Sequence, residues 1–214
     1  MKKLTLLLTC LFFLFLSSCI EIRETLTMNK DGSGNINLVV DMGKIGKSLG
    51  QQNQQINMSF VKQIQNTPAQ ADSLLKSCKG ISNLKTSTGG DVGVYSVSFD
   101  FKNSKSLNEA LYKLFRQKKT ALRPDFIKVS KHKVRQMNFA PLIKKYVLKE
   151  ESNVMSDMLY QLIKIQSTFN LPSKTKSVSN IKAVQENEDK SVVLKYSLFE
   201  LLNYDFDYGV VIKY

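Results

Sequence analysis

The stretch IEIRETLTMNKDGSGNINLVVDM, residues 20–42, decides the fold. Apolar and polar residues alternate on both sides of a polar centre, and alternation with a period of two marks strands with one buried face. The centre, NKDGSG at residues 29–34, supplies the Asn, Asp and Gly that tight turns favour. The stretch therefore predicts an N-terminal β-hairpin. Its inward positions are Ile20, Ile22, Leu26 and Met28 on one strand and Ile36, Leu38, Val40 and Met42 on the other.

The residues before the hairpin indicate export. Two lysines precede an apolar run at residues 4–16, which is shorter than the ~20 residues that a membrane-spanning helix needs. Leu16-Ser17-Ser18-Cys19 follows and resembles the lipobox of bacterial lipoproteins. The resemblance implies cleavage before Cys19, diacylglycerol on the Cys19 sulfur and a third acyl chain on the new amine. Several acyl chains hold a protein on a membrane almost permanently, so we expect Cys19 to be the lipid attachment site. A secretory signal with a chance cysteine is the alternative.

Helical and strand patterns alternate unevenly after the hairpin. Residues 43–55 are rich in Gly and Gln and predict a connection, and a helix over 56–64 is expected to be interrupted at Pro68. The best amphipathic stripe predicts a helix over 107–118, with a capping box formed by Ser106 and Glu109. Further helices are expected over 69–76, 141–149 and 198–202, and strands over 95–101, 126–129, 134–139, 160–169, 192–196 and 204–214.

This order of elements favours an α+β fold with a mainly antiparallel sheet, an N-terminal hairpin and helices packed on one face. With 214 residues, of which 43% are hydrophobic, the chain can build one substantial core. We expect a signal peptide over residues 1–18, a lipidated N-terminus and short tether over 19–24, and a single α+β domain over 25–214.

Three features resemble the LppM-like domain of bacterial lipoproteins. They are Cys19 behind its lipobox, the hairpin with Asp31-Gly32-Ser33-Gly34, and a late segment with Leu171-Pro172, Ser179-Asn180 and Val192-Val193-Leu194. The chain departs from the pattern in lacking a glycine after Pro172 and in having Tyr196 where the pattern expects an aromatic residue such as Trp. The resemblance implies a membrane-anchored α+β domain in the cell envelope. It carries no catalytic residues to transfer, and it suggests an apolar ligand pocket.

Positive charge is concentrated in one segment. The formal net charge is +13, and residues 113–149 hold twelve Lys or Arg against one acid, Asp125. Such an asymmetry indicates an anionic partner, and export argues against nucleic acid. Anionic lipid headgroups or envelope polysaccharide are therefore the expected partners, with a solvated lysine-rich surface as the alternative. The candidate contacts are Lys128, Lys131, Lys133 and Arg135. Lys128 differs in strand parity from the others, so a common face needs a turn near residues 130–132 that resets the register.

The sequence contains no signature of catalysis or of a metal site. It has one histidine, His132, which is expected in an exposed turn, and one thiol in the mature chain, Cys78, expected as a small apolar helix residue. Residues 29–36 imitate the start of a calcium-binding loop, but the twelfth position is Val40 instead of a bidentate Glu. The carboxylate pairs Glu150-Glu151 and Asp205-x-Asp207 are expected to be solvated. We therefore expect no metal, no cofactor and no enzymatic activity.

The expected function is a non-catalytic binding or structural role for an envelope lipoprotein, anchored at the outer membrane through Cys19. Two alternatives stay open. One is a carrier of an apolar or lipid ligand, with a cavity lined by residues such as Phe99, Phe169 and Tyr208. The other is a hydrolase with an unrecognised site. The sequence indicates neither the biological partner nor the oligomeric state.

Overall fold

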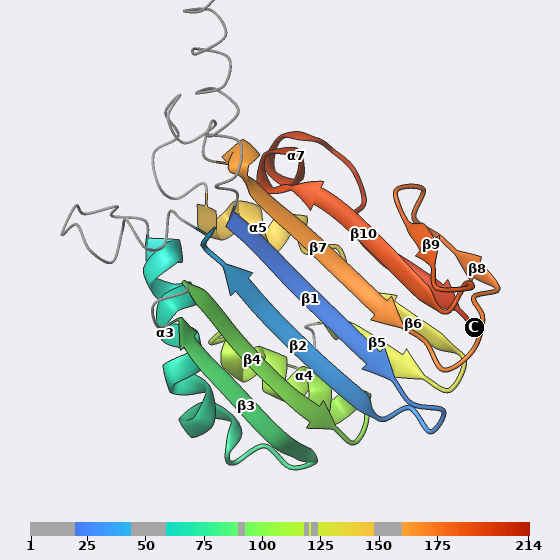
Figure 1. Cartoon of the computed structure of the whole chain (residues 1–214), viewed down its shortest axis with the longest axis horizontal. Helices are drawn as coiled ribbons and strands as arrows, with labels where there is room; N and C mark the ends of the chain where they lie inside the picture. Colours follow the sequence, from blue (N-terminus) through green and yellow to red (C-terminus); the bar gives the residue numbers. More distant parts are fainter. Residues whose placement is uncertain (1–19, 44–58, 90–92, 118–119, 121–123, 148–159) are drawn as a thin grey trace, which may run out of the picture.

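The protein consists of two β-sheets with helices beside the smaller one (Figure 1). The computed structural model describes residues 20–43, 59–89, 93–117, 120, 124–147 and 160–214. The predictions for the signal peptide, for Cys19, for residues 44–55 of the connection and for Glu150-Glu151 lie outside the described residues. No helix in the described ranges has both the length and the hydropathy needed to cross a membrane.

The larger sheet has seven strands in the order β3-β4-β2-β1-β7-β10-β9. Neighbouring strands are antiparallel except for β1 and β7, which run parallel. The expected α+β class with a mainly antiparallel sheet is therefore confirmed. The seven strands are β1 (Ile20–Met28), β2 (Gly34–Asp41), β3 (Ile81–Gly89), β4 (Val94–Phe101), β7 (Ile163–Asn170), β9 (Val184–Glu186) and β10 (Ser191–Ser197).

The hairpin that decides the fold is present as predicted. Leu26 faces Ile36 across β1 and β2, and both side chains are completely buried. The turn uses Gly32 at a φ of 88°, where a side chain would be strained, and Asp31 accepts a 3.0 Å hydrogen bond from the Ser33 amide. Because β1 begins at Ile20, residues 20–24 of the predicted tether belong to the sheet.

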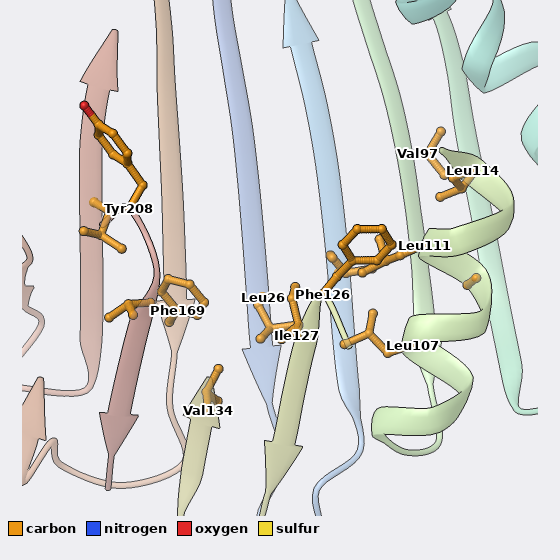
Figure 2. Packing of buried hydrophobic residues seen from close by; sticks show 14 of the residues in the cluster. Leu26, Val97, Leu107, Leu111, Leu114, Phe126, Ile127, Val134, Phe169 and Tyr208 are labelled. Carbon is orange, nitrogen blue, oxygen red and sulfur yellow. The ribbon is translucent and has the colours of Figure 1, made fainter. Parts of the chain in front are cut away.

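The smaller sheet packs against one face of the larger sheet. Its order is β5-β6-β11-β8, and all its pairs are antiparallel. Figure 2 shows Ile127 and Val134 of this sheet beside Leu26 and Phe169 of the larger one. The four strands are β5 (Ile127–Ser130), β6 (Lys133–Gln136), β8 (Ser177–Val178) and β11 (Val210–Lys213).

Three helices lie on the same face of the larger sheet as the smaller sheet, as expected (Figure 1). Leu107 and Leu111 of α4 are buried against the larger sheet (Figure 2). We call this covered face the inner face. Among the described residues, no helix or strand covers the opposite, outer face. The helices are α3 (Ser59–Leu75), α4 (Ser104–Leu114) and α5 (Ala140–Val147), with the short α7 (Leu198–Asn203) after β10.

The predicted interruption at Pro68 is wrong, because α3 continues through it to Leu75. A proline inside a helix removes one amide donor and strains the preceding turn. Here Pro68 is buried, and so are Ala71 and Leu75, three and seven positions later. The proline thus belongs to the helix stripe that packs on the sheet, and this burial offsets the lost hydrogen bond.

The predicted capping box of α4 is also wrong. The N-cap is Asn103, whose side-chain oxygen accepts a 3.0 Å hydrogen bond from the Ser106 amide. The Ser106 hydroxyl in turn accepts a 3.1 Å hydrogen bond from the Asn103 amide. Ser106 is therefore the third residue of the helix, and Glu109 plays no part in the cap. The helix ends at Leu114, before the predicted end at residue 118.

The predicted strand over residues 204–214 is mostly irregular. Only Val210–Lys213 form β11, which belongs to the smaller sheet. Tyr204 is 55% exposed and Phe206 is half-buried, whereas Tyr208 is buried. The alternation of aromatic and polar residues over 204–208 therefore does not mark a strand. It belongs to an irregular segment that packs some of its aromatic side chains onto the core.

The sequence did not predict three strands, β3, β8 and β9, which lie at sheet edges. β3 is an exposed edge strand with a bulge between Ser82 and Lys85, and β8 and β9 have two and three residues. Cys78 is buried as expected, but it lies in the turn after α3 instead of in a helix. The remaining strands agree with their predicted positions to within a few residues at each end.

Candidate functional site

The four candidate cationic residues converge on β5, β6 and the turn between them. Ser130 pairs with Lys133, and Lys128 pairs with Arg135. Paired residues of an antiparallel sheet point to the same side, so the intervening turn resets the register. Lys128, Lys133 and Arg135 consequently share one exposed face, and Lys131 stands exposed in the turn. Lys213 of β11 pairs with Lys133 and extends this face. We call these five residues, Lys128, Lys131, Lys133, Arg135 and Lys213, the basic face.

The buried side of the smaller sheet holds the basic face rigid. Ile127, Val134 and Ile212 alternate with the cations and are fully buried in the core. The last residue fastens the turn, because the Tyr214 amide donates a 3.0 Å hydrogen bond to the His132 carbonyl. Its hydroxyl also donates a 2.9 Å hydrogen bond to the Ser130 carbonyl. His132 itself is exposed in this turn, as predicted.

The side chains of the basic face are unpaired. None of the five forms a side-chain hydrogen bond or an ion pair with another residue that the structure describes. The other outward positions of β5, β6 and β11 are Ser130 and Val211, so these strands place no acid on the face. Two other cations of the basic segment have partners elsewhere: Lys113 donates to Ser77, and Arg116 donates to Gln70. The face therefore offers concentrated, uncompensated positive charge.

A second cluster lies between the two sheets around Glu24, which sequence reasoning missed. Its carboxylate oxygen Oε2 accepts a 2.8 Å hydrogen bond from Gln136 Nε2 of β6 and a 3.2 Å hydrogen bond from Ser167 Oγ of β7. Burial raises the pKa of Glu24 to about 7, although both hydrogen bonds favour the ionised form. Tyr196 of β10 hydrogen-bonds to Ser167, and burial raises its pKa as well.

The Glu24 cluster joins the sheets but lacks the partners of an acid–base site. Within the described residues, no second carboxylate, His or Cys contacts Glu24, and no group of three or more His, Cys, Asp or Glu could hold a metal ion. A sequence signal did exist, since Glu24 occupies an inward position between Ile22 and Leu26. A charged residue at an apolar position of an alternating strand indicates a buried polar contact.

Two hollows open on the outer face of the larger sheet. The first, of about 570 Å³, lies at the β1–β2 turn and is lined by Thr27, Asn35 and Asp100. Hydrogen bonds from Asn35 and Asn83 hold the pKa of Asp100 below its ordinary value. The second, of about 410 Å³, crosses β1, β7 and β10, and we call it the lysine groove. Its outward side chains are Glu21, Arg23, Lys164, Gln166, Lys195 and Ser197, with Glu200 of α7 at its end.

The other residues singled out in the sequence do not form a site in the described structure. Phe99, Phe169 and Tyr208, named for an apolar cavity, are buried in the core and line neither hollow. Cys78 is buried and His132 is exposed, so the thiol and the imidazole do not meet. Asp207 is exposed and accepts a 2.8 Å hydrogen bond from the Gly209 amide, which is a local turn contact.

Comparison with known proteins adds one structural similarity. No family model matches the chain, and no curated protein matches it. The chain is similar to the folded domain of Mycobacterium tuberculosis LppM, whose structure was determined by NMR, with a TM-score of 0.43 and 8% sequence identity. The similarity covers 92% of this chain and 91% of that one. The assignment to an LppM-like family therefore stays a prediction.

Proposed function

We propose that this chain is a non-catalytic envelope lipoprotein, anchored through Cys19, whose domain binds anionic lipid headgroups through the basic face. One observation carries the proposal: the smaller sheet presents Lys128, Lys133, Arg135 and Lys213 on one face, with no acid at an outward position of β5, β6 or β11 and no side-chain partner among the described residues. Lys131 adds a cation at the turn. Outer-membrane localisation belongs to the same proposal, and it rests on the lipobox resemblance.

Charge near a membrane surface explains the expected strength of binding. Each near-surface Lys or Arg contributes ~1 kcal/mol of attraction to anionic lipids. Replacing four of them should therefore lower the affinity by about three orders of magnitude, since about 1.4 kcal/mol corresponds to a factor of ten. The attraction should also weaken with salt, because the Debye length falls from ~10 Å at 0.1 M to ~3 Å at 1 M.

The test uses the chain from residue 19 onward with Cys19→Ala, so that acyl chains do not contribute. Sedimentation with phosphatidylglycerol vesicles should show binding that phosphatidylcholine vesicles do not. Combined substitution of Lys128, Lys131, Lys133 and Arg135 by Gln should remove it. A matched variant replaces four lysines that are exposed elsewhere, Lys30, Lys79, Lys105 and Lys190, by Gln and should retain it.

Three results would contradict the proposal. Equal loss in both quadruple variants would assign the attraction to net charge and not to the basic face. If the protein with an unaltered basic face does not bind phosphatidylglycerol vesicles at low salt, the face is only a solvated lysine-rich surface. Preferential binding of a phosphate-bearing polysaccharide over the vesicles would replace lipid by glycan as the partner.

A further inference from the structure

The lysine groove lies on a surface that the proposed function does not use. It is on the outer face of the larger sheet, whereas the basic face belongs to the smaller sheet on the other side of the domain. The uncovered outer face is turned toward the viewer in Figure 1. Its strands β1, β7 and β10 place polar side chains along the groove. The groove is therefore a separate candidate binding site.

Most charged groups around the groove are already paired. Arg23 donates to Glu21 at 3.1 Å and to Asp41 at 3.5 Å. Glu200 accepts from Lys182 Nζ at 3.0 Å and from the Ser197 amide at 2.7 Å. The Lys182–Glu200 pair is neutral, whereas Arg23 stands against two carboxylates and leaves one negative charge at its end of the groove. Both sets of contacts hold the walls of the groove in place.

Two amino groups remain without partners in the described structure, Lys164 and Lys195. Both are exposed and lie on neighbouring strands, where Lys164 pairs with Ser197 and Lys195 pairs with Gln166. This register makes the two lysines diagonal neighbours, whose Cα atoms lie ~7–8 Å apart. Long, flexible side chains at that separation can reach a single anionic group placed between them.

The side chains beyond the lysines favour a ligand that is polar along its length. Gln166 donates to the Thr168 hydroxyl at 3.1 Å, which leaves the Gln166 carbonyl oxygen to accept a hydrogen bond. Thr168 belongs to the adjacent outward row, which lies beside the lining of the groove and continues across β1, β2 and β4 with Thr25, Asn37 and Ser98. The row carries no aromatic side chain, so an apolar ligand would gain little here. Hydroxyl and amide groups in a row match the hydroxyl groups of a sugar chain.

We infer that the lysine groove binds an acidic saccharide, with its carboxylate held between Lys164 and Lys195. The sugar hydroxyls then exchange hydrogen bonds with Gln166 and the neighbouring polar row. Charge complementarity selects the acid group, and the polar row selects the saccharide. A neutral sugar chain lacks the contact to both lysines and should bind more weakly.

The experiment uses isothermal titration calorimetry on the same Cys19→Ala chain. One titration adds a hexasaccharide of uronic acids, and the other adds a neutral hexasaccharide of glucose. The acidic sugar should bind at least tenfold more tightly. The double variant Lys164→Gln/Lys195→Gln should lose at least tenfold in affinity for it. The matched variant Lys79→Gln/Lys105→Gln removes the same charge from exposed positions outside the lysine groove and the basic face, and it should bind the sugar like the unaltered protein. Both pairs are exposed, and a thermal melt checks that each variant remains folded.

Each contrary outcome overturns the inference. Equal affinity for the two sugars would exclude an anion site, and equal loss in both double variants would assign binding to net charge. No binding of the acidic sugar at millimolar concentration would leave the groove without this ligand. Binding of Lys164→Gln/Lys195→Gln to phosphatidylglycerol vesicles is measured separately and should persist. This measurement tests the basic face alone, so a failure of the saccharide inference can be told apart from a failure of the proposed function.

Discussion

Glu24 shows how one residue can make the stability of the domain depend on pH. Its carboxyl lies between the sheets and has a pKa of about 7, against an ordinary value of 4.5. A raised pKa means that the folded state holds the proton more tightly than the unfolded state. The resulting stabilisation is fully present below about pH 4.5 and is lost as the pH rises through 7.

Glu24→Gln should therefore remove a pH dependence from the folding equilibrium. The variant keeps a polar group beside Gln136 and Ser167 but cannot ionise. Urea unfolding should show it to be more stable than the parent at pH 8, by up to ~3 kcal/mol, with a much smaller difference at pH 4.5. Glu186→Gln, on an exposed strand, serves as the control for loss of a carboxyl outside the sheet interface. The same difference at both pH values would show that Glu24 does not titrate in this range.

Elements with a strict sequence pattern were predictable, and elements defined by their neighbours were not. β1, β2 and β4 alternate with few exceptions, such as Glu24 on the inner side of β1, because the inner face of each strand is mostly apolar and the outer face is mostly polar. β3 shows no such contrast, since most of its side chains are exposed at the edge. The basic face lies between these cases. Its residues could be chosen from the charge run, but their common side depended on the Lys131-His132 turn.

The cap of α4 offers a direct comparison between the predicted and the observed capping pairs. Asn103→Ala should destabilise the protein by about 1 kcal/mol, because the Ser106 amide loses its acceptor. Glu109→Ala should cost less, since Glu109 takes no part in the cap. Chemical denaturation of the two variants measures the difference. A larger effect at Glu109 would favour the box predicted from the sequence.

The short strand β11 is a further element whose removal should be costly, because it stands between β6 and β8. Truncation after Gly209 removes three side chains that are at most 2% exposed, those of Val210, Ile212 and Tyr214. Burying each contributes ~1.5–3 kcal/mol, and the sum is comparable to the ~5–15 kcal/mol by which a typical domain is stable. Circular dichroism should show loss of the cooperative thermal transition. Tyr204→Ser, at a position that is 55% exposed, should melt like the parent protein; a truncated chain that also did so would contradict this role for β11.

At the scale of the whole molecule, the two sheets divide the surface into two chemically different faces. The smaller sheet presents unpaired cations, and the larger sheet presents a mixed polar face with two hollows. The charge run along the sequence indicated most residues of the first face, although Lys213 joins it only through the pairing of β11 with β6. The second could not be predicted, since its residues come from strands far apart in the sequence and meet only through the register of β1, β7 and β10.

Attachment of the whole molecule to a membrane should depend on Cys19. Cys19→Ala removes the sulfur that the lipobox resemblance identifies as the acylation site, so acylation should cease. Cell fractionation should then find the protein lost from washed membranes, whereas Cys78→Ala should remain bound. A Cys19→Ala protein that is processed and still fractionates with membranes after a high-salt wash would show that the lipobox interpretation is wrong.

The position of β1 has a mechanical consequence. The strand begins immediately after residue 19 and is bonded to β2 on one side and to β7 on the other along nearly its whole length. A force applied at residue 19 therefore pulls along the axis of an interior strand, across rows of hydrogen bonds that run between the strands. Those bonds carry the load together in shear, instead of opening one at a time like a zipper. If the domain is anchored through Cys19 as proposed, tension from the anchor would meet this resistance at the first strand of the sheet.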